Sequence, residues 1–326
     1  MSITIKLQGG LGNQLFIYAF GKALMLHTGL DIKFDITEYQ GEYRQYELNH
    51  FNTNAITVKF KRKKNIFKKI IKECLIIKSL KNKINVYDEF PRYKTLNTHN
   101  GFEYDEEFKN IQNGNYIKGF FQNEKYFLDI ANEIRQNFKL ITPLDEKNKK
   151  IIEDIKNTES ISLHIRRGDY LTIAKDYGSC SIEYYQKALE IIKEKINAEN
   201  LKAFIFTDDP EWVKENIKFD IDTYYVENNL GKGYFDLELM KNCKHNIIAN
   251  SSFSWWGAWL NENPNKIVIA PKPWLASVEN DYELIPKSWI RIEGFNSLSQ
   301  MPSRVERVIP LKVVKIIHNN KLKKVA

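Results

Sequence analysis

The sequence has only three cysteines among its 326 residues, Cys74, Cys180 and Cys243. Their number is odd, they lie far apart, and none has the Cys-x-x-Cys spacing of zinc and redox sites. This pattern favours neither a disulfide framework nor a metal centre. We expect the three side chains to fill space in the core.

Long apolar runs are also missing. No stretch of about eighteen uninterrupted apolar residues occurs, which argues against a membrane-spanning helix. The segment Met1 to Leu7 leads into a strand-like run and lacks the apolar region and small-residue cleavage site of a secretory signal. We therefore expect a cytoplasmic globular protein. Its 43% hydrophobic and 13% aromatic content is sufficient for well-filled cores in two domains.

Positive charge is abundant but confined to two segments of a chain whose net charge is +8. Residues 59–83 contain eleven Lys or Arg against one Glu, and residues 304–326 contain seven against one. The remainder is acidic, which argues against a nucleic-acid partner. Apolar residues recur at helical spacing in 59–83, so this segment predicts a basic amphipathic helix. Its apolar face either packs on its own domain or binds an anionic membrane peripherally, at the inner face of the plasma membrane.

The N-terminal segment predicts a strand, a glycine loop and a helix. Ile3 to Leu7 forms the expected strand, QGGLGN the loop, and the following sixteen residues the helix, with Asn13 as N-cap. Gly10 and Gly12 begin the dinucleotide fingerprint G-x-G-x-x-G, but Leu15 occupies the third glycine position. Asp35 follows the next strand where a ribose-binding carboxylate would lie. An NAD-type dehydrogenase is therefore one alternative, and a simple tight turn is another.

A second strand ends in a cluster of charges at SLHIRRGDYL, residues 162–171. The alternation of side chains places His164 and Arg166 on one face and Arg167 on the other. Gly168 allows the chain to turn sharply after the strand, where open α/β sheets have their ligand crevice. An arginine at this position can bind two phosphate oxygens at once. A surface ion-pair cluster is the alternative interpretation.

Strands and helices alternate along the second half of the chain. The pattern predicts strands at 161–165, 203–206, 223–226, 246–249 and 267–270, after a strand at 115–122, a helix at 123–138 and a domain boundary between residues 142 and 159. Such alternation is typical of a parallel sheet covered on both faces. We expect an α/β protein with an N-terminal Rossmann-like domain over residues 1–150, a C-terminal one over 151–295, and a basic tail over 296–326.

Two further strand ends are polar. One strand is followed by Asp208 and Asp209, and another by NSSFSWWGAW. In a parallel sheet these ends share one rim with His164 and Arg166. Hydroxyls and backbone N–H groups at a helix N-terminus suit a phosphate, here from Ser251, Ser252 and Ser254. We expect the aspartates to hold Arg167 and leave Arg166 free, and at least one of Trp255, Trp256 and Trp259 to be buried in the core.

Four of these motifs occur in the order found in bacterial α-1,2-fucosyltransferases of glycosyltransferase family 11. They are GGLGNQLF, HIRRGDY, FTDDPEW and NIIANSSFSWWGAWL, in a resemblance that covers residue 1 to about 290. The H-x-R-R element is similar to that of the α-1,6- and protein O-fucosyltransferases. The resemblance implies a GT-B-like architecture, in which two Rossmann-like domains face a central cleft, and GDP-β-L-fucose as donor.

The resemblance also implies roles for individual residues. Arg166 corresponds to the arginine that holds the donor β-phosphate, and His164 lies beside the sugar or diphosphate. Asp208 and Asp209 match the acidic pair that supports the arginines. A second phosphate-contacting loop matches Ser252, Phe253 and Ser254, next to Ser251. The first-domain loop that faces the reaction centre matches Gly10, Gly12, Asn13 and Gln14.

The implied reaction is an inverting displacement, in which the hydroxyl of a galactoside-terminated surface glycan such as O-antigen attacks C1 of fucose while GDP departs. Since Asp208 and Asp209 are adjacent and form no D-x-D pair, we expect neither a metal nor another cofactor. Asp169 is the first candidate for the catalytic base, although a salt bridge would lower its pKa. Asn13 is expected to orient the acceptor.

Three other interpretations stay open from the sequence. Another GDP-sugar glycosyltransferase of the same fold would present a similar rim. An NAD-type dehydrogenase fits the glycine loop incompletely. A non-enzymatic basic membrane adaptor rests only on the two lysine-rich segments, against an acidic remainder.

Overall fold

The structure is a computed structural model that describes residues 2–40, 44–60, 102–168, 170, 177–196, 198, 200–276 and 283–295. The described residues therefore exclude the basic segment after Phe60, the tail from residue 296, Asp169 and Cys74. The predictions made for them are not tested by the fold.

The first sheet has four parallel strands in the order β3-β2-β1-β4. These are β1 (Ser2–Lys6), β2 (Asp31–Asp35), β3 (Thr57–Val58) and β4 (Tyr116–Ile117). The crossover from β1 to β2 is α1 (Leu11–Thr28), which ends at Gly29 in the left-handed region. The strand expected over 115–122 is confirmed only for its first residues, because the chain leaves the sheet after Ile117.

Short helical segments lie between the strands of this sheet and along the chain that leads to the second half. They are η1 (Thr37–Gln40), η2 (Leu48–His50), η3 (Glu106–Asn110), η4 (Glu124–Tyr126), η5 (Leu128–Ile130) and α3 (Ala131–Asn137). One continuous helix over 123–138 was the expectation, and it is wrong. The buried Asn123 caps the first turn through Lys125 N, and the fully buried Phe127 breaks the helical path between η4 and η5.

The second sheet has six parallel strands in the order β10-β9-β8-β5-β6-β7. This is the strand order of doubly wound nucleotide-binding folds, with the direction of winding reversed between β5 and β8. The strands are β5 (Glu159–Ile165), β6 (Leu201–Thr207), β7 (Asp222–Tyr225), β8 (His245–Ile247), β9 (Val268–Lys272) and β10 (Ile290–Glu293). The predicted α/β class is confirmed. Among the six strands of this second sheet, only β10 was not expected.

Five helices accompany this sheet: α4 (Glu146–Asn157), α5 (Ile182–Lys195), α6 (Pro210–Asn216), α7 (Gly233–Asn242) and α8 (Ser252–Leu260). α4 spans residue 150, where the sequence suggested a division. Its buried Ile151 and Ile155 pack with Phe204 and Phe206 of β6, so the whole helix belongs to the second sheet.

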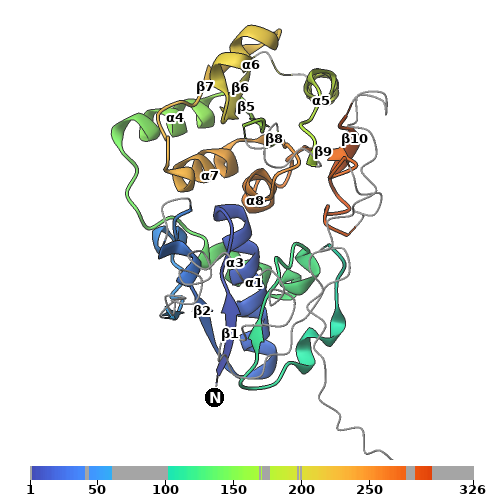
Figure 1. Cartoon of the computed structure of the whole chain (residues 1–326). Coiled ribbons are helices and arrows are strands. Elements are labelled where there is room, and N and C mark those ends of the chain that lie inside the picture. Colours follow the sequence, from blue (N-terminus) through green and yellow to red (C-terminus); the bar gives the residue numbers. More distant parts are fainter. Residues whose placement is uncertain are drawn as a thin grey trace, which may run out of the picture.

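The two halves are stacked, with α1 facing α8 where they meet (Figure 1). Phe16 of α1 lies 4.5 Å from the Trp255 ring and 4.9 Å from the Trp256 ring, measured between centroids. Trp255, Trp256 and Trp259 are all buried, as expected of a core helix. This aromatic packing holds the loop before α1 against the loop before α8.

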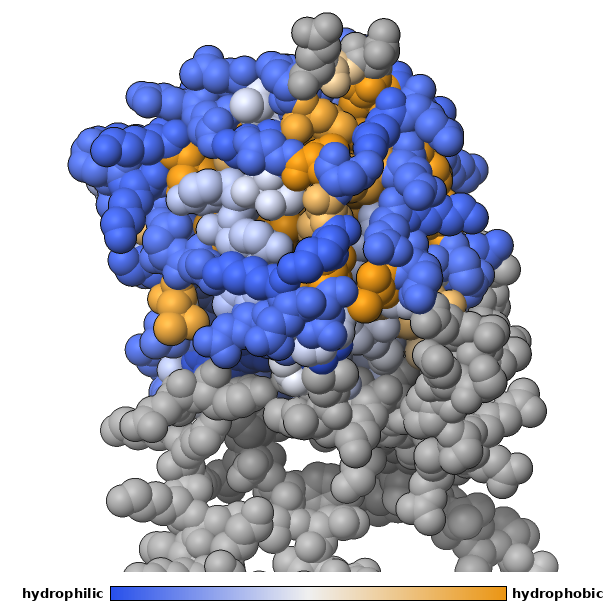
Figure 2. Space-filling view, turned by 90° about the horizontal axis from the view of Figure 1, so that it is seen from above, coloured by the Kyte–Doolittle hydropathy of each residue, from blue (hydrophilic) through white to orange (hydrophobic). Residues whose placement is uncertain are grey.

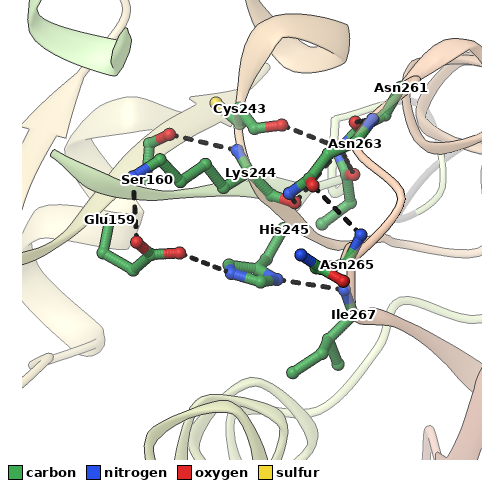
Figure 3. A network of polar contacts seen from close by, with 10 residues as sticks. Glu159, Ser160, Cys243, Lys244, His245, Asn261, Asn263, Asn265 and Ile267 are labelled. Carbon is green, nitrogen blue, oxygen red and sulfur yellow. Dashed lines mark hydrogen bonds and ion pairs between the residues drawn. The ribbon is translucent and has the colours of Figure 1, made fainter. Parts of the chain in front are cut away.

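A polar network ties β5, β8 and β9 together near the amino ends of β5 and β8 (Figure 3). The buried His245 bonds Glu159 through Nε2 at 2.8 Å and accepts from Ile267 N through Nδ1 at 3.0 Å. Lys244 Nζ also donates to Glu159, at 2.9 Å. Because His245 Nδ1 accepts a hydrogen bond, its Nε2 carries the proton, and the imidazole connects two strands while neutral.

Seen from above, the second half of the molecule is predominantly hydrophilic, with its apolar residues gathered in limited areas (Figure 2). Within the described ranges, no helix is long and apolar enough to cross a membrane. Cys180 and Cys243 are buried and free, as expected of core cysteines.

Candidate active site

The carboxyl ends of β5 and β8 lie beside each other where the winding of the second sheet reverses. Ligands of doubly wound sheets bind at this point, because the loops that leave the two strands diverge and open a crevice. β5 leads into Arg166 and Arg167, and β8 leads into Ser251 and the N-terminus of α8. The structure therefore brings together the polar strand ends that the sequence predicted.

His164 is buried at the end of β5, with an exposed fraction of 5%. Its ring lies edge-on to Phe253 with 5.8 Å between centroids, and its Nδ1 atom has no hydrogen-bond partner among the described residues. Burial, with a contribution from Arg166, lowers the pKa of His164 to about 3. The imidazole is thus neutral at physiological pH and can donate or accept a hydrogen bond without carrying charge.

Arg166 and Arg167 are both paired with the aspartates that follow β6. Arg166 Nη1 lies 3.1 Å from Asp208 Oδ2, and Arg167 Nε lies 3.3 Å from Asp209 Oδ2. The prediction that the aspartates leave Arg166 free is wrong, because the Arg167 N–H also binds Asp208 and draws that carboxylate between the two arginines. Arg167 also stacks on Trp212 at 3.3 Å, so it is the more fixed of the pair.

Gly168 makes this arrangement possible. A Cβ atom there would lie 2.7 Å from Asp208 Oδ2, closer than a carbon and an oxygen can approach. The glycine in HIRRGDY therefore admits the carboxylate that holds Arg166.

The three serines before and within α8 have different surroundings. Ser251 is the N-cap and accepts from Phe253 N at 3.4 Å. Ser254 is buried and donates to the carbonyl groups of Ala249 and Ser251, so its hydroxyl serves the helix. Ser252 instead reaches the first half of the molecule. Its phosphate-binding role, like that of Phe253, stays a prediction.

The glycine loop before α1 lies directly on this serine loop. A Cβ atom on Gly12 would lie 2.5 Å from both Phe253 N and Ser252 C, so only glycine permits the approach. Asn13 Oδ1 accepts hydrogen bonds from Ser252 Oγ at 2.9 Å and from Gln122 Nε2 at 2.8 Å. Asn13 was expected to cap the helix, and this is wrong. The helix begins at Leu11 with Gly10 as N-cap, which leaves the Asn13 amide for contacts between the two halves.

Gln14 is fully buried and supports a neighbouring segment instead of facing the crevice. Its amide nitrogen donates to Gln45 O at 2.8 Å and to Gly9 O at 3.2 Å, and its oxygen accepts from Glu47 N at 2.9 Å. The side chain thus fixes residues 45–47 beside the glycine loop. Gly10 lies close to Arg44, which precedes this segment. A Cβ atom on Gly10 would be 3.6 Å from Arg44 Nη1.

Glu47 lies close to these residues, and the sequence did not indicate it. Its Oε1 atom lies 3.6 Å from the position of a Cβ atom on Gly233, and Phe253 Cε2 lies 3.5 Å from the same point. Burial raises the pKa of Glu47 to about 7, although Arg44 opposes the shift. No motif surrounds this glutamate, and its significance depends on burial that only the folded chain creates.

The alternatives raised by the sequence find no support at the other strand ends. Asp35, the possible ribose ligand, accepts hydrogen bonds from Thr37 N, Thr37 Oγ1 and Tyr116 Oη, so it stabilises the turn after β2. In the described parts of the chain, no cluster of three or more His, Cys, Asp or Glu side chains could hold a metal ion. Metal-independent activity stays a prediction.

Comparison with known proteins shows the family of this chain. The family model described as glycosyl transferase family 11 matches residues 2–293. The chain belongs to glycosyltransferase family 11. The match includes the glycine loop, the arginine strand end and the serine loop, and it confirms the resemblance that the motifs indicated.

Two relatives from Escherichia coli match this family 11 glycosyltransferase over most of their length. An alpha-1,2-colitosyltransferase is 36% identical over 90% of this chain and 100% of that protein. The O-antigen biosynthesis glycosyltransferase WbnK is 33% identical over 88% of this chain and 99% of that protein. Family membership makes the chain a glycosyltransferase and not a dehydrogenase or a non-enzymatic adaptor.

Solved structures show weaker similarity. The fucosyltransferase NodZ from Bradyrhizobium is 14% identical, with a TM-score of 0.46 over 78% of this chain and 91% of that chain. At this distance the similarity supports no argument about the donor or the acceptor of this glycosyltransferase.

Proposed function

We propose that this glycosyltransferase transfers L-fucose from GDP-β-L-fucose to the 2-hydroxyl of a terminal β-galactoside, with inversion at C1, in the synthesis of a surface polysaccharide such as O-antigen. The observation that carries the proposal is the meeting of Arg166, the serine loop and the glycine loop at the switch point of a family 11 chain. The donor would lie along the second sheet and the acceptor against the first.

Charge on the departing diphosphate is the main obstacle to this reaction. Arg166 would bind the β-phosphate, held in position by Asp208 at 3.1 Å. The N-terminus of α8 would add backbone N–H groups and the positive end of its dipole. Preorganised donors of this kind stabilise charge as it develops, without reorganisation during the reaction. The neutral His164 would donate or accept a hydrogen bond beside the sugar or the diphosphate.

A second donor has a specific observation in its favour, because the relative that is 36% identical is named as a colitosyltransferase. Colitose is fucose without the 3-hydroxyl, so GDP-colitose would offer the same diphosphate to Arg166. The two donors differ only in that hydroxyl, so the site can distinguish them only by whether it binds the 3-hydroxyl. The acceptor, too, rests on the family resemblance and on one relative that is named for O-antigen biosynthesis.

Donor competition distinguishes these possibilities. The purified protein is incubated with a panel of β-galactosides and equal concentrations of GDP-fucose and GDP-colitose, with GDP-mannose as control. The proposal predicts the larger kcat/KM for GDP-fucose. A larger kcat/KM for GDP-colitose would make GDP-colitose the donor in place of GDP-fucose. Exclusive use of GDP-mannose would contradict both donor assignments.

A further inference from the structure

Glu47 belongs to the first half of the molecule, and Gln14 of α1 fixes its backbone. The Gln14 side chain bonds the backbone at Gln45 O and Glu47 N. η2 begins immediately after Glu47, with the buried Leu48 in the core. The backbone that carries this carboxylate is therefore fixed on both sides.

The Glu47 carboxylate lies near the Phe253 ring, which packs against His164. A Cβ atom on Gly233 would lie 3.6 Å from Glu47 Oε1 and 3.5 Å from Cε2 of the Phe253 ring. Phe253 in turn contacts the His164 ring at 5.8 Å between centroids. One aromatic ring thus separates Glu47 from the strand end that bears Arg166.

The groups that face Glu47 favour a carboxylate able to take up a proton near neutral pH. Arg44 is the cation that lowers its pKa, but burial has the larger effect and raises the pKa to about 7. Two tyrosines lie in its field, Tyr39 beside the glycine loop and Tyr234 on α7, and burial raises the pKa of both, so they stay neutral. His50 stacks on Tyr234 at 3.7 Å and has a pKa lowered by burial, so it is neutral as well.

Other described groups at the cleft are less suited to this task. Asp208 and Asp209 each form an ion pair with an arginine, so both carboxylates are already engaged. His164 has a pKa near 3 and takes up protons poorly. Within the described residues, the Glu47 carboxylate forms no hydrogen bond or ion pair that would occupy it.

We propose that Glu47 is the general base of the transfer reaction, an inference that rests on the proposed function. Its carboxylate takes the proton of the acceptor hydroxyl while the hydroxyl oxygen forms its bond to C1 of the donor sugar. The bond from C1 to the β-phosphate oxygen breaks, and its electron pair leaves with GDP. Asp169, which the sequence favoured, lies outside the described residues and is compared with Glu47 in the test below.

The test compares Glu47→Gln, Asp169→Asn and wild type, with Glu133→Gln as a control for removal of an ion-paired carboxylate far from the cleft. Glu133 lies on α3 and pairs with Lys22 at 2.7 Å. We expect Glu47→Gln to lower kcat about 10²-fold to 10⁴-fold, the range for loss of a general base. Its affinity for GDP, measured by calorimetry, should stay within twofold of wild type, and Glu133→Gln should match wild type in both.

Two further readouts separate a base from a structural residue. The wild-type kcat/KM should rise with pH through about 7 and level off, and this limb should be absent in Glu47→Gln. Formate should restore part of the activity of Glu47→Ala by supplying a carboxylate in the space left by the side chain. Near-normal kcat in Glu47→Gln with an unchanged pH limb, or an inactive Asp169→Asn beside an active Glu47→Gln, would overturn the proposal.

Failure of the proposed function gives a different result. A wild-type protein that uses another GDP-sugar in place of GDP-fucose contradicts the donor assignment, and the same variants then test Glu47 with that sugar. A wild-type protein that transfers no sugar contradicts the proposed function and the inference with it.

Discussion

Asn13 Oδ1 and Ser252 Oγ lie 2.9 Å apart and form a hydrogen bond between loops separated by 239 residues. The bond joins the glycine loop of the first sheet to the serine loop of the second. Beside it, Gly12 touches the backbone at Ser252 and Phe253. The geometry of the crevice therefore depends on this contact, and its perturbation gives the first prediction.

Gly12→Ala should force the two loops apart. The new Cβ would lie 2.5 Å from two backbone atoms that cannot rotate away, and overpacking of this kind costs about 1–3 kcal/mol or more. Thermal unfolding should show a clear loss of stability in Gly12→Ala. Gly10→Ala is the matched control for stability, because its Cβ would meet Arg44 at 3.6 Å, an ordinary contact. Equal Tm values for the two variants would contradict the close approach.

Arg166→Ala should remove the contact that we propose for the donor β-phosphate. Loss of one preorganised donor to developing charge lowers kcat about 10²-fold to 10³-fold, or about 2.7–4 kcal/mol in the barrier. GDP affinity, measured by calorimetry, should fall as well. Lys187→Ala, an exposed site on α5, controls for loss of one positive charge. If both variants bind GDP equally well, the β-phosphate does not lie at Arg166.

The difference in stability between Glu47→Gln and wild type should change with pH in a defined direction. The pKa of Glu47 is raised from 4.5 to about 7 on folding, so the native state holds its proton more tightly than the unfolded state does. Wild type therefore loses stability as the pH rises from about 4.5 to 7, and glutamine does not ionise. Glu47→Gln should gain in Tm relative to wild type between pH 5 and pH 8. A Tm difference that is constant over this range would contradict burial of the carboxylate.

His245→Ala should affect folding and leave donor binding intact. The substitution leaves Glu159 without one hydrogen bond and Ile267 N without its acceptor. Loss of a hydrogen bond to a charged group lowers the free energy of unfolding by about 2 kcal/mol. Denaturant unfolding should show this loss, while GDP affinity should be unchanged because the network lies near the opposite ends of the strands. A variant as stable as wild type would mean that water replaces the imidazole.

Transfer should persist in excess EDTA. The proposed stabilisation of the diphosphate comes from Arg166 and the N-terminus of α8, and neither requires a divalent ion. Sugar transfer is measured before and after chelation, with and without added Mn²⁺ or Mg²⁺. Activity that disappears with EDTA and returns only with metal would contradict this account.

The sequence predicts the second sheet well because its strands are short apolar runs that end in polar residues. His164, Arg166, Asp208 and Ser252 follow or end such strands, and their convergence follows from a parallel sheet. The exact pairing of Arg166 with Asp208 does not follow, because it depends on the Arg167 N–H and on the space above Gly168. Side-chain pairing at a turn is decided by distances that alternation does not determine.

Other features depend on contacts between distant segments. Asn13 satisfies the local rule for an N-cap, but a hydroxyl 239 residues away binds its amide oxygen. Glu47 has an ordinary sequence environment and acquires its raised pKa only from the segments that bury it. His245 lies just before the strand predicted at 246–249, and its partners Glu159 and Ile267 become its neighbours only when β5, β8 and β9 assemble (Figure 3).

The linkage formed by the wild-type protein tests the central proposal most directly. The protein is incubated with GDP-fucose and a β-galactoside, and the product is analysed by NMR for its anomeric configuration and linkage position. We predict one product, in which fucose is joined in α configuration to the 2-hydroxyl of galactose. Release of free fucose without transfer, a β linkage or a bond to another hydroxyl would contradict it.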